Sequence, residues 1–257
     1  MKMNYLIKII LNKIPRKYLI KLSIFLKPFL KILYKGSKYI DPIDNSSYRK
    51  FLPYGYNKIR ENALCPGTFS LERHRLLWLY LKNETDYFKK KSKVLHIAPE
   101  QIFYKKFNSF KNWDYTTLDL FSPLAKIKAD ICNMPFTNDK FDLIICNHVL
   151  EHVVDDKKAL SEIYRVLKRG GCAILQVPIN ESIEKSKENK GFMTRAQRTK
   201  EFGQYDHIRS YGNDFYKLLK SVGFIVKATD YLKKIDYNLK IKYCLPKNEK
   251  IPIAYKV

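Results

Sequence analysis

The stretch that decides the fold is FDLIICNHVLEH, residues 141–152. Its first half is almost wholly apolar, as the buried strands of a parallel sheet tend to be. An acidic pair at 155–156 then begins a segment whose apolar residues fall on one helix face, and Gly170-Gly171 is expected to end that helix. Residues 172–177 form another apolar run. A strand, a helix and a strand in this order predict a βαβ unit with parallel strands.

The same alternation continues on both sides of this unit. Residues 94–98 and 113–118 are short apolar runs upstream. Downstream, a helix over 214–222 is predicted to precede a strand over 224–228. We therefore expect an α/β fold with a Rossmann-like, doubly wound, mostly parallel sheet.

Positive charge is concentrated at the start of the chain, where residues 1–40 hold ten of the 49 Lys and Arg and no acidic residue. Apolar residues recur there at helical spacing, and Pro15 and Pro28 are expected to break the pattern into short amphipathic helices. We predict a basic helical extension over 1–40, a turn-rich linker over 41–70 and the main domain over 71–257. One sizeable core fits this length.

Lys27, Lys31 and Lys35 are spaced by four, so they share one helix face. Basic helices with an apolar side suit an anionic membrane surface. We expect residues 1–35 to lie there, with packing on the domain or on a partner as the alternative. No apolar run approaches the roughly 20 residues of a spanning helix, and the first residues lack a signal-peptide core. A cytoplasmic protein, peripheral on the inner membrane face, is therefore expected.

The five cysteines are scattered through the chain without a CxxC pair. Neither a disulfide framework nor a zinc site is indicated by this spacing. We therefore predict no metal.

Polar side chains follow the predicted strands, where ligands of open parallel sheets bind. The first strand runs into HIAPE, residues 96–100, and Asp119 follows the second. Asp130 and Ile131 come shortly before the third. An acid after the second strand can accept hydrogen bonds from both ribose hydroxyls, and one at Asp130 can accept from an adenine amino group. The pattern predicts a nucleoside pocket.

These segments together resemble the class I S-adenosylmethionine-dependent methyltransferases, most closely the methyltransferase type 11 branch. The resemblance rests on ADICNMPF (129–136), FDLIICNHVLEH (141–152) and YRVLKRGG (164–171). It covers roughly residues 71–228. It implies S-adenosylmethionine as the cofactor and methyl transfer as the reaction.

The resemblance also implies roles for single residues of the pocket. In that family, the residue matching Asp119 holds the ribose, and those matching Asp130 and Ile131 border the adenine. Those matching Asn147 and His148 lie beside the methionine part of the cofactor.

The first loop departs from the family pattern, which is usually glycine-rich there. Ala98 and Pro99 restrict the backbone where glycine would permit close approach to the cofactor. The HIAPE form resembles that of a bacterial subset of the family. Glu100 is expected to face the cofactor's ammonium group, and His96 either contacts the cofactor or packs under the loop.

Methyl transfer from a sulfonium is an in-line displacement, so the enzyme has to align the acceptor and manage one proton. His152 and His207 are the candidate bases, with loop-shaping and structural hydrogen bonding as their respective alternatives. Arg209 is a candidate for holding an anionic acceptor. Arg73 to Arg75, at the start of a helix predicted over 71–81, are expected to be solvated, with contact to a carboxylate or phosphate as the alternative.

We therefore expect methyl transfer to a hydroxyl of a saccharide or other small molecule. An RNA methyltransferase is one alternative, because the formal charge of +24 would attract phosphates, but no RNA-binding module is recognisable, so nucleic acid is not the expected partner. A non-catalytic protein that retains the fold is another, because the first loop lacks glycine. The absence of GxGxxG after any strand disfavours a dinucleotide oxidoreductase.

Overall fold

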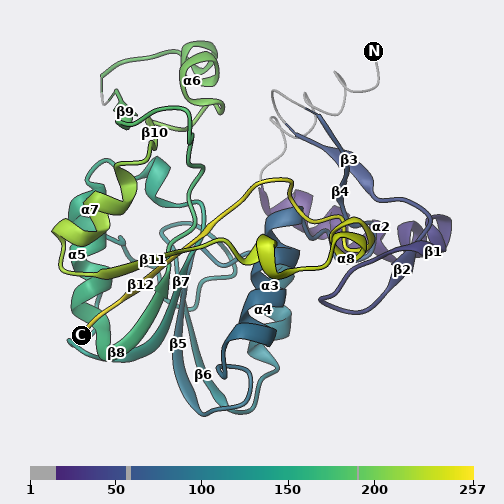
Figure 1. The fold of residues 1–257 in the computed structure, drawn as a ribbon, viewed down its shortest axis with the longest axis horizontal. Coiled ribbons are helices and arrows are strands. Elements are labelled where there is room, and N and C mark those ends of the chain that lie inside the picture. The colour runs from purple at the N-terminus through teal and green to yellow at the C-terminus, as the bar shows by residue number, and fades with distance from the viewer. Residues whose placement is uncertain (1–15, 56–58, 190) are drawn as a thin grey trace.

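A six-stranded sheet forms the centre of the computed structural model, which describes residues 16–55, 59–189 and 191–257 (Figure 1). The strand order is β11-β12-β8-β7-β5-β6. The strands are β5 (Ser92–Ile97), β6 (Trp113–Leu118), β7 (Phe141–Cys146), β8 (Leu167–Ile174), β11 (Ile225–Thr229) and β12 (Ile251–Tyr255). The four strands from β6 to β8 run parallel, and β12 is antiparallel to both of its neighbours. The predicted mostly parallel α/β sheet is confirmed.

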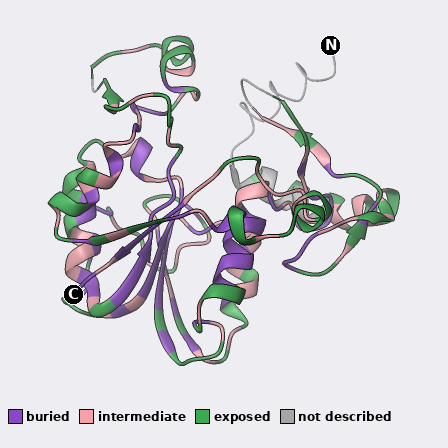
Figure 2. Cartoon of the chain, in the orientation of Figure 1, coloured by how far each residue is buried: buried purple, intermediate pink, exposed green. Residues whose placement is uncertain are grey.

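Helices cover both faces of this sheet (Figure 1). The bounds are α3 (Glu72–Glu84) and α4 (Gln101–Asn108) on one face, and α5 (Asp156–Val166) and α7 (Phe215–Ser221) on the other. Successive residues of a strand point to opposite faces. Ile144 of β7 accordingly packs in one core cluster and Ile145 in the other, and both are fully buried. Figure 2 shows the buried residues concentrated along these strands and the helix sides that face them.

The C-terminal strand β12 inserts between β8 and β11. Ile251 and Ile253 are completely buried there. The family resemblance ended near residue 228, so no strand was predicted for these last residues. The short apolar run IPIAY is too brief to be assigned from its own pattern.

The two glycines expected to end α5 lie instead inside β8, so that prediction was wrong. The helix stops at Val166 because Leu167 is already extended (φ −74°, ψ 134°). The pairing of β7 with β8 shifts register between Phe141 and Leu143, and Gly170 adopts a left-handed φ of 74° within that irregularity. Gly170 therefore lies at an irregularity of the strand. Glycine suits this position for the same reason that it suits a helix end, because it adopts a left-handed backbone without steric cost.

Helix α2 (Arg16–Leu33) continues through Pro28, so the predicted break there was also wrong. Pro28 is exposed, and water can satisfy the carbonyl that the missing N–H leaves unpaired. Pro15 and the rest of residues 1–15 lie outside the described residues. Within the described ranges, no helix combines the length and apolarity needed to cross a membrane.

The segment expected as a linker is packed against its own small core. It contains β2 (Ser47–Tyr48), paired with β1 (Lys35–Ile40), and β3 (Leu52–Tyr54), paired with β4 (Arg60–Leu64). Tyr48, Phe51 and Cys65 are buried together between these strands. Residues 35–40 of the predicted helical extension form β1, so Lys35 does not share a helix face with Lys27 and Lys31, and that part of the prediction was wrong.

Residues 178–213, here called the cap segment, form an excursion between β8 and α7. Its elements are β9 (Lys187–Glu188), α6 (Arg195–Phe202) and β10 (Arg209–Ser210). In Figure 1 it stands beyond the end of the sheet at which β7 leads into the 3₁₀ helix η1 (Leu150–His152). The buried Arg209 fastens it there, because its Nη1 donates to Leu150 O at 2.7 Å and its Nη2 to Val154 O at 3.1 Å. The cap segment therefore faces the carboxyl edge of the sheet.

Candidate functional site

Strand order reverses between β5 and β7. These strands are neighbours, but the chain continues from β5 to β6 on one side and from β7 to β8 on the other. In open parallel sheets, ligands bind outside the carboxyl ends of the strands at such a switch point. The candidate site is therefore expected just beyond Ile97 and Cys146.

One residue near the start of each of these two loops has a left-handed backbone. Ala98 has φ 50° and His148 has φ 54°. For residues other than glycine this conformation costs about 1 kcal/mol or more, and such backbone strain is concentrated at functional sites. Neighbouring strands hold the loops in place, since Ala98 N donates to Leu118 O at 2.8 Å and His148 N to Gln176 O at 2.7 Å. Ala98 thus adopts the conformation for which the family's glycine is suited.

Glu100 is the centre of a polar cluster at the end of β5. Its Oε2 lies 2.6 Å from His96 Nε2, and its Oε1 accepts from Asn147 Nδ2 at 3.3 Å. Burial raises the pKa of Glu100, but the hydrogen bond and the charge of His96 outweigh burial and lower it to about 2. His96 is itself fully buried, with Nδ1 2.7 Å from the hydroxyl of Tyr115. It packs under the loop, which is the second of the two roles considered for it.

His74 brings the start of α3 into this cluster. Its Nδ1 accepts from Leu71 N at 3.1 Å, so the proton of the neutral ring sits on Nε2, 3.7 Å from Glu100 Oε1. Burial holds the pKa of His74 well below its usual value, so the ring is neutral. Both His74 and Arg75 are buried, so a solvated helix start was the wrong expectation for them. The sequence offered no signal that α3 would face the first loop.

Three buried polar atoms at this place have no hydrogen-bond partner among the described residues: His74 Nε2, Asn147 Oδ1 and His148 Nε2. Buried polar groups normally have a hydrogen-bond partner, so each of these atoms marks a position where a ligand or a water molecule is expected. Two come from residues that the resemblance placed beside the methionine part of the cofactor, and His74 was missed. Together they provide one donor and further polar atoms close to an ionised carboxylate.

The segment that returns from α8 (Tyr237–Lys242) to β12 crosses the same edge of the sheet (Figure 1). Its Glu249 accepts from Gln176 Nε2 at 3.1 Å, just after β8. Burial raises the pKa of Glu249. The site is therefore flanked by this segment on one side and by the cap segment on the other.

The predicted nucleoside residues lie after β6. Asp119 is half-buried, and its Oδ1 accepts from Phe121 N at 2.7 Å and Ser122 N at 2.6 Å. Its second oxygen has no partner in the part of the chain that the structure describes. Asp130 is exposed, with Oδ1 accepting from Cys132 N at 2.8 Å, and Ile131 is buried beside it. In both acids, one carboxylate oxygen thus accepts hydrogen bonds from the backbone of its own turn, and the second oxygen is left for a ligand.

The two candidate bases, His152 and His207, lie together, with ring centroids 4.8 Å apart. His152 comes from η1 and His207 from the cap segment. Burial lowers the pKa of His207, which keeps its ring neutral at neutral pH. Arg209, by contrast, cannot hold an acceptor, because its buried guanidinium is occupied by backbone carbonyls of η1 and by Glu188 at 3.1 Å. That expectation was wrong, since the guanidinium instead donates to backbone carbonyls of η1 and of the residues that follow it.

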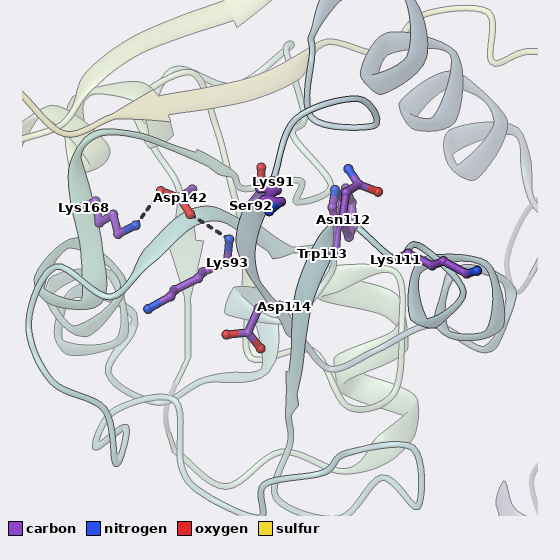
Figure 3. A pocket seen from close by; sticks show the side chains of 9 residues that line it. All are labelled: Lys91, Ser92, Lys93, Lys111, Asn112, Trp113, Asp114, Asp142 and Lys168. Atoms are coloured by element: carbon purple, nitrogen blue, oxygen red, sulfur yellow. Dashed lines mark hydrogen bonds and ion pairs between the residues drawn. The ribbon is translucent and has the colours of Figure 1, made fainter.

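A separate hollow lies at the opposite, amino end of the strands (Figure 3). It includes Asp142, whose Oδ1 accepts from Lys168 Nζ at 2.7 Å and whose Oδ2 accepts from the backbone N of Lys93 at 2.7 Å. It contains none of the site residues that follow the carboxyl ends of the strands. Because ligands of such sheets bind at the carboxyl edge, we place the site there and not in this hollow.

The sheet, with its switch point between β5 and β7, has the arrangement implied by the resemblance to class I S-adenosylmethionine-dependent methyltransferases. Residues 86–175 match the model of the family described as methyltransferase domain. This match covers β5, β6, β7 and β8.

Comparison with curated proteins gives partial matches. An uncharacterized protein of Methanocaldococcus jannaschii is 32% identical over 133 residues, which are 51% of this chain and 56% of that protein. The demethylmenaquinone methyltransferase of Clavibacter sepedonicus is 39% identical over 49 residues, 19% of this chain and 20% of that enzyme. The chain spans about half the length of the first curated relatives it matches.

Among solved structures, an S-adenosylmethionine-dependent methyltransferase from Archaeoglobus fulgidus aligns with a TM-score of 0.47 and 14% identity. The alignment covers 73% of this chain and 95% of that one.

Proposed function

We propose that this protein binds S-adenosylmethionine at the carboxyl edge of β5, β6 and β7 and transfers its methyl group to a hydroxyl of a saccharide or other small molecule. The observation that carries the proposal is the set of unpartnered buried atoms around Glu100. The amino-acid end of the cofactor carries an ammonium and a carboxylate. Asn147 Oδ1 and the ionised Glu100 suit the ammonium, and the Nε2–H of His74 suits the carboxylate.

The nucleoside end of the cofactor fits the acids after β6. Asp119 would accept from the ribose hydroxyls with the oxygen that its own turn leaves over, and Asp130 with Ile131 would border the adenine. The residues present therefore fit the whole cofactor without a glycine-rich loop. When bound, S-adenosylmethionine supplies an electrophilic methyl group, and the protein supplies alignment and removal of one proton.

The acceptor would enter between η1 and the cap segment, where His148, His152 and His207 gather. The neutral His207 has the protonation state of a base. The methyl-transfer test is an assay with methyl-labelled S-adenosylmethionine against saccharide, lipid-linked and RNA acceptors. Label in a saccharide or lipid-linked product would support the proposal, label in RNA would replace its acceptor class, and binding without transfer to any class would favour a non-catalytic role.

We further propose that helix α2 holds the protein on an anionic membrane surface, peripherally on the inner face. Phe25, Phe29 and Ile32 are 79%, 64% and 77% exposed, and their spacing of four and three places them on one helix face. Contiguous exposed apolar side chains mark an interaction surface. Lys27 and Lys31 lie on the opposite side of the helix, where Lys31 forms an ion pair with Asp44, so the apolar face itself would enter the lipid interface.

Vesicle co-sedimentation tests the α2 proposal. We expect the protein to bind vesicles with anionic lipid and to bind zwitterionic vesicles more weakly, because the formal net charge of +24 attracts anionic headgroups. Phe25→Asp with Phe29→Asp should weaken binding at least about 100-fold, since two buried rings are lost. Phe192→Asp, which changes a still more exposed phenylalanine in the cap segment, should leave binding unchanged. Equal binding of all three proteins would contradict the proposal.

A further inference from the structure

Three metal-ligating side chains converge beside the proposed acceptor entrance. Glu151, His152 and His207 each offer one ligand atom, and these atoms all lie within 4.8 Å of one another. The first two belong to η1, and His207 reaches them from the cap segment. The sequence suggested the two histidines only as separate bases, because they are 55 positions apart in the chain, and it predicted no metal.

The hydrogen bonds of the two histidines leave the same ring atom available on each. His152 Nδ1 lies 3.2 Å from Asp206 O, and His207 Nδ1 lies 3.2 Å from Phe202 O. A carbonyl oxygen only accepts, so each Nδ1 carries the proton and each Nε2 keeps its lone pair. Neither Nε2 has a hydrogen-bond partner among the described residues. Histidines that bind metals show this arrangement, in which the second nitrogen donates to a carbonyl.

Glu151 adds an unsatisfied negative group. The residue is 1% exposed, and its Oε1 accepts from His148 Nδ1 at 3.2 Å. Its Oε2 is buried without any hydrogen-bond partner. A carboxylate oxygen left unpaired in the interior is costly, and a cation beside it removes that cost.

We propose that Glu151, His152 and His207 bind a divalent transition-metal ion. Two imidazole nitrogens and one carboxylate oxygen are the donor set of one type of catalytic zinc site, which keeps a further position open. With bonds of about 2.0–2.2 Å, ligand atoms of a tetrahedral site lie about 3.4 Å apart, so the three groups must close by about 1.4 Å at most. His152 is only partly buried and can rotate to do so.

The open position would face the acceptor. This part of the inference rests on the proposed function. A hydroxyl bound to the ion loses its proton to solvent more readily, because the cation stabilises the oxyanion. His207 would then be a ligand rather than the base, and the acceptor class would be a hydroxyl compound able to approach the ion through the cap segment.

Titration of the metal-free, full-length protein with Co²⁺, followed by its visible absorption, and with Zn²⁺ by calorimetry tests the site. We expect one ion per chain. Glu151→Gln, which keeps the shape of the side chain, and His207→Ala should each weaken binding at least about 100-fold, since even indirect partners of metal ligands are worth 10–100-fold. The control Cys132→Ser, which removes a partly exposed thiol near this end of the sheet, should bind as the unchanged protein does.

Absence of binding by the unchanged, folded protein would overturn the metal site. Binding that survives in both Glu151→Gln and His207→Ala would overturn it as well. S-adenosylmethionine titrated in the presence of a chelator reports on the cofactor pocket alone, so a failed metal site and a failed cofactor site give different results.

Discussion

Replacing Arg75 with leucine is expected to lower the free energy of unfolding by about 3–5 kcal/mol, because several buried carbonyls lose their donor at once. Arg75 Nε donates to Tyr243 O at 2.7 Å, and its two Nη atoms donate to the carbonyls of Ser70, Ala63 and Cys244 at 2.8, 3.1 and 2.6 Å. The guanidinium thereby ties α3 to the segment after α8 and to β4. For a chain of this size we expect the melting temperature to fall by about 10 °C.

Thermal unfolding of two further variants makes this prediction specific. Arg75→Lys keeps the charge but offers a single ammonium instead of a planar fork, so most of the loss should remain. Arg169→Leu changes an exposed arginine and should alter stability by no more than about 0.5 kcal/mol. A melting temperature of Arg75→Leu within about 2 °C of the unchanged protein would show that α3 is held by other contacts.

Asp119→Ala is expected to weaken S-adenosylmethionine binding by about 100-fold or more. A carboxylate that accepts from both ribose hydroxyls makes two charge-assisted hydrogen bonds of about 1.5–3 kcal/mol each, and 1.4 kcal/mol corresponds to a factor of ten in affinity. The loss should appear in the dissociation constant measured by calorimetry, with the fold retained.

Asp119→Asn distinguishes the loss of cofactor contacts from the loss of the turn that Asp119 stabilises. Its amide oxygen can still accept from Phe121 N and Ser122 N, so the loop should keep its shape while the charge is lost. An intermediate loss of about tenfold is expected for this variant. Asp114→Ala, an exposed acid at the other end of β6, serves as the control and should bind as before. Equal affinity of all variants would remove Asp119 from the cofactor site.

The strands that position the site could be predicted because they are short, continuous apolar runs. Residues 113–118 and 141–146 were predicted as the strands that the structure contains, and Asp119 follows from the first of them. The prediction of a buried strand needs only local hydrophobicity, and the carboxyl edge then follows from parallel pairing. Local pattern was sufficient for this half of the site.

What the sequence could not predict depends on contacts between distant segments. His74 joins Glu100 only because α3 packs beside the first loop, and His207 meets His152 only because Arg209 fastens the cap segment to η1. Pro28 and Gly170 were misjudged for a related reason, since exposure and strand pairing decided their roles. No periodicity in a single sequence reports such contacts.

The measurement that tests the central claim most directly is calorimetric titration of the intact protein with S-adenosylmethionine and S-adenosylhomocysteine. The cluster around Glu100 and the acids after β6 predict one site per chain, of micromolar affinity for both molecules. Heat of binding at that stoichiometry would establish the cofactor pocket despite a first loop without glycine. No detectable binding by folded protein would contradict the account and would mean that Ala98 and Pro99 have closed the site.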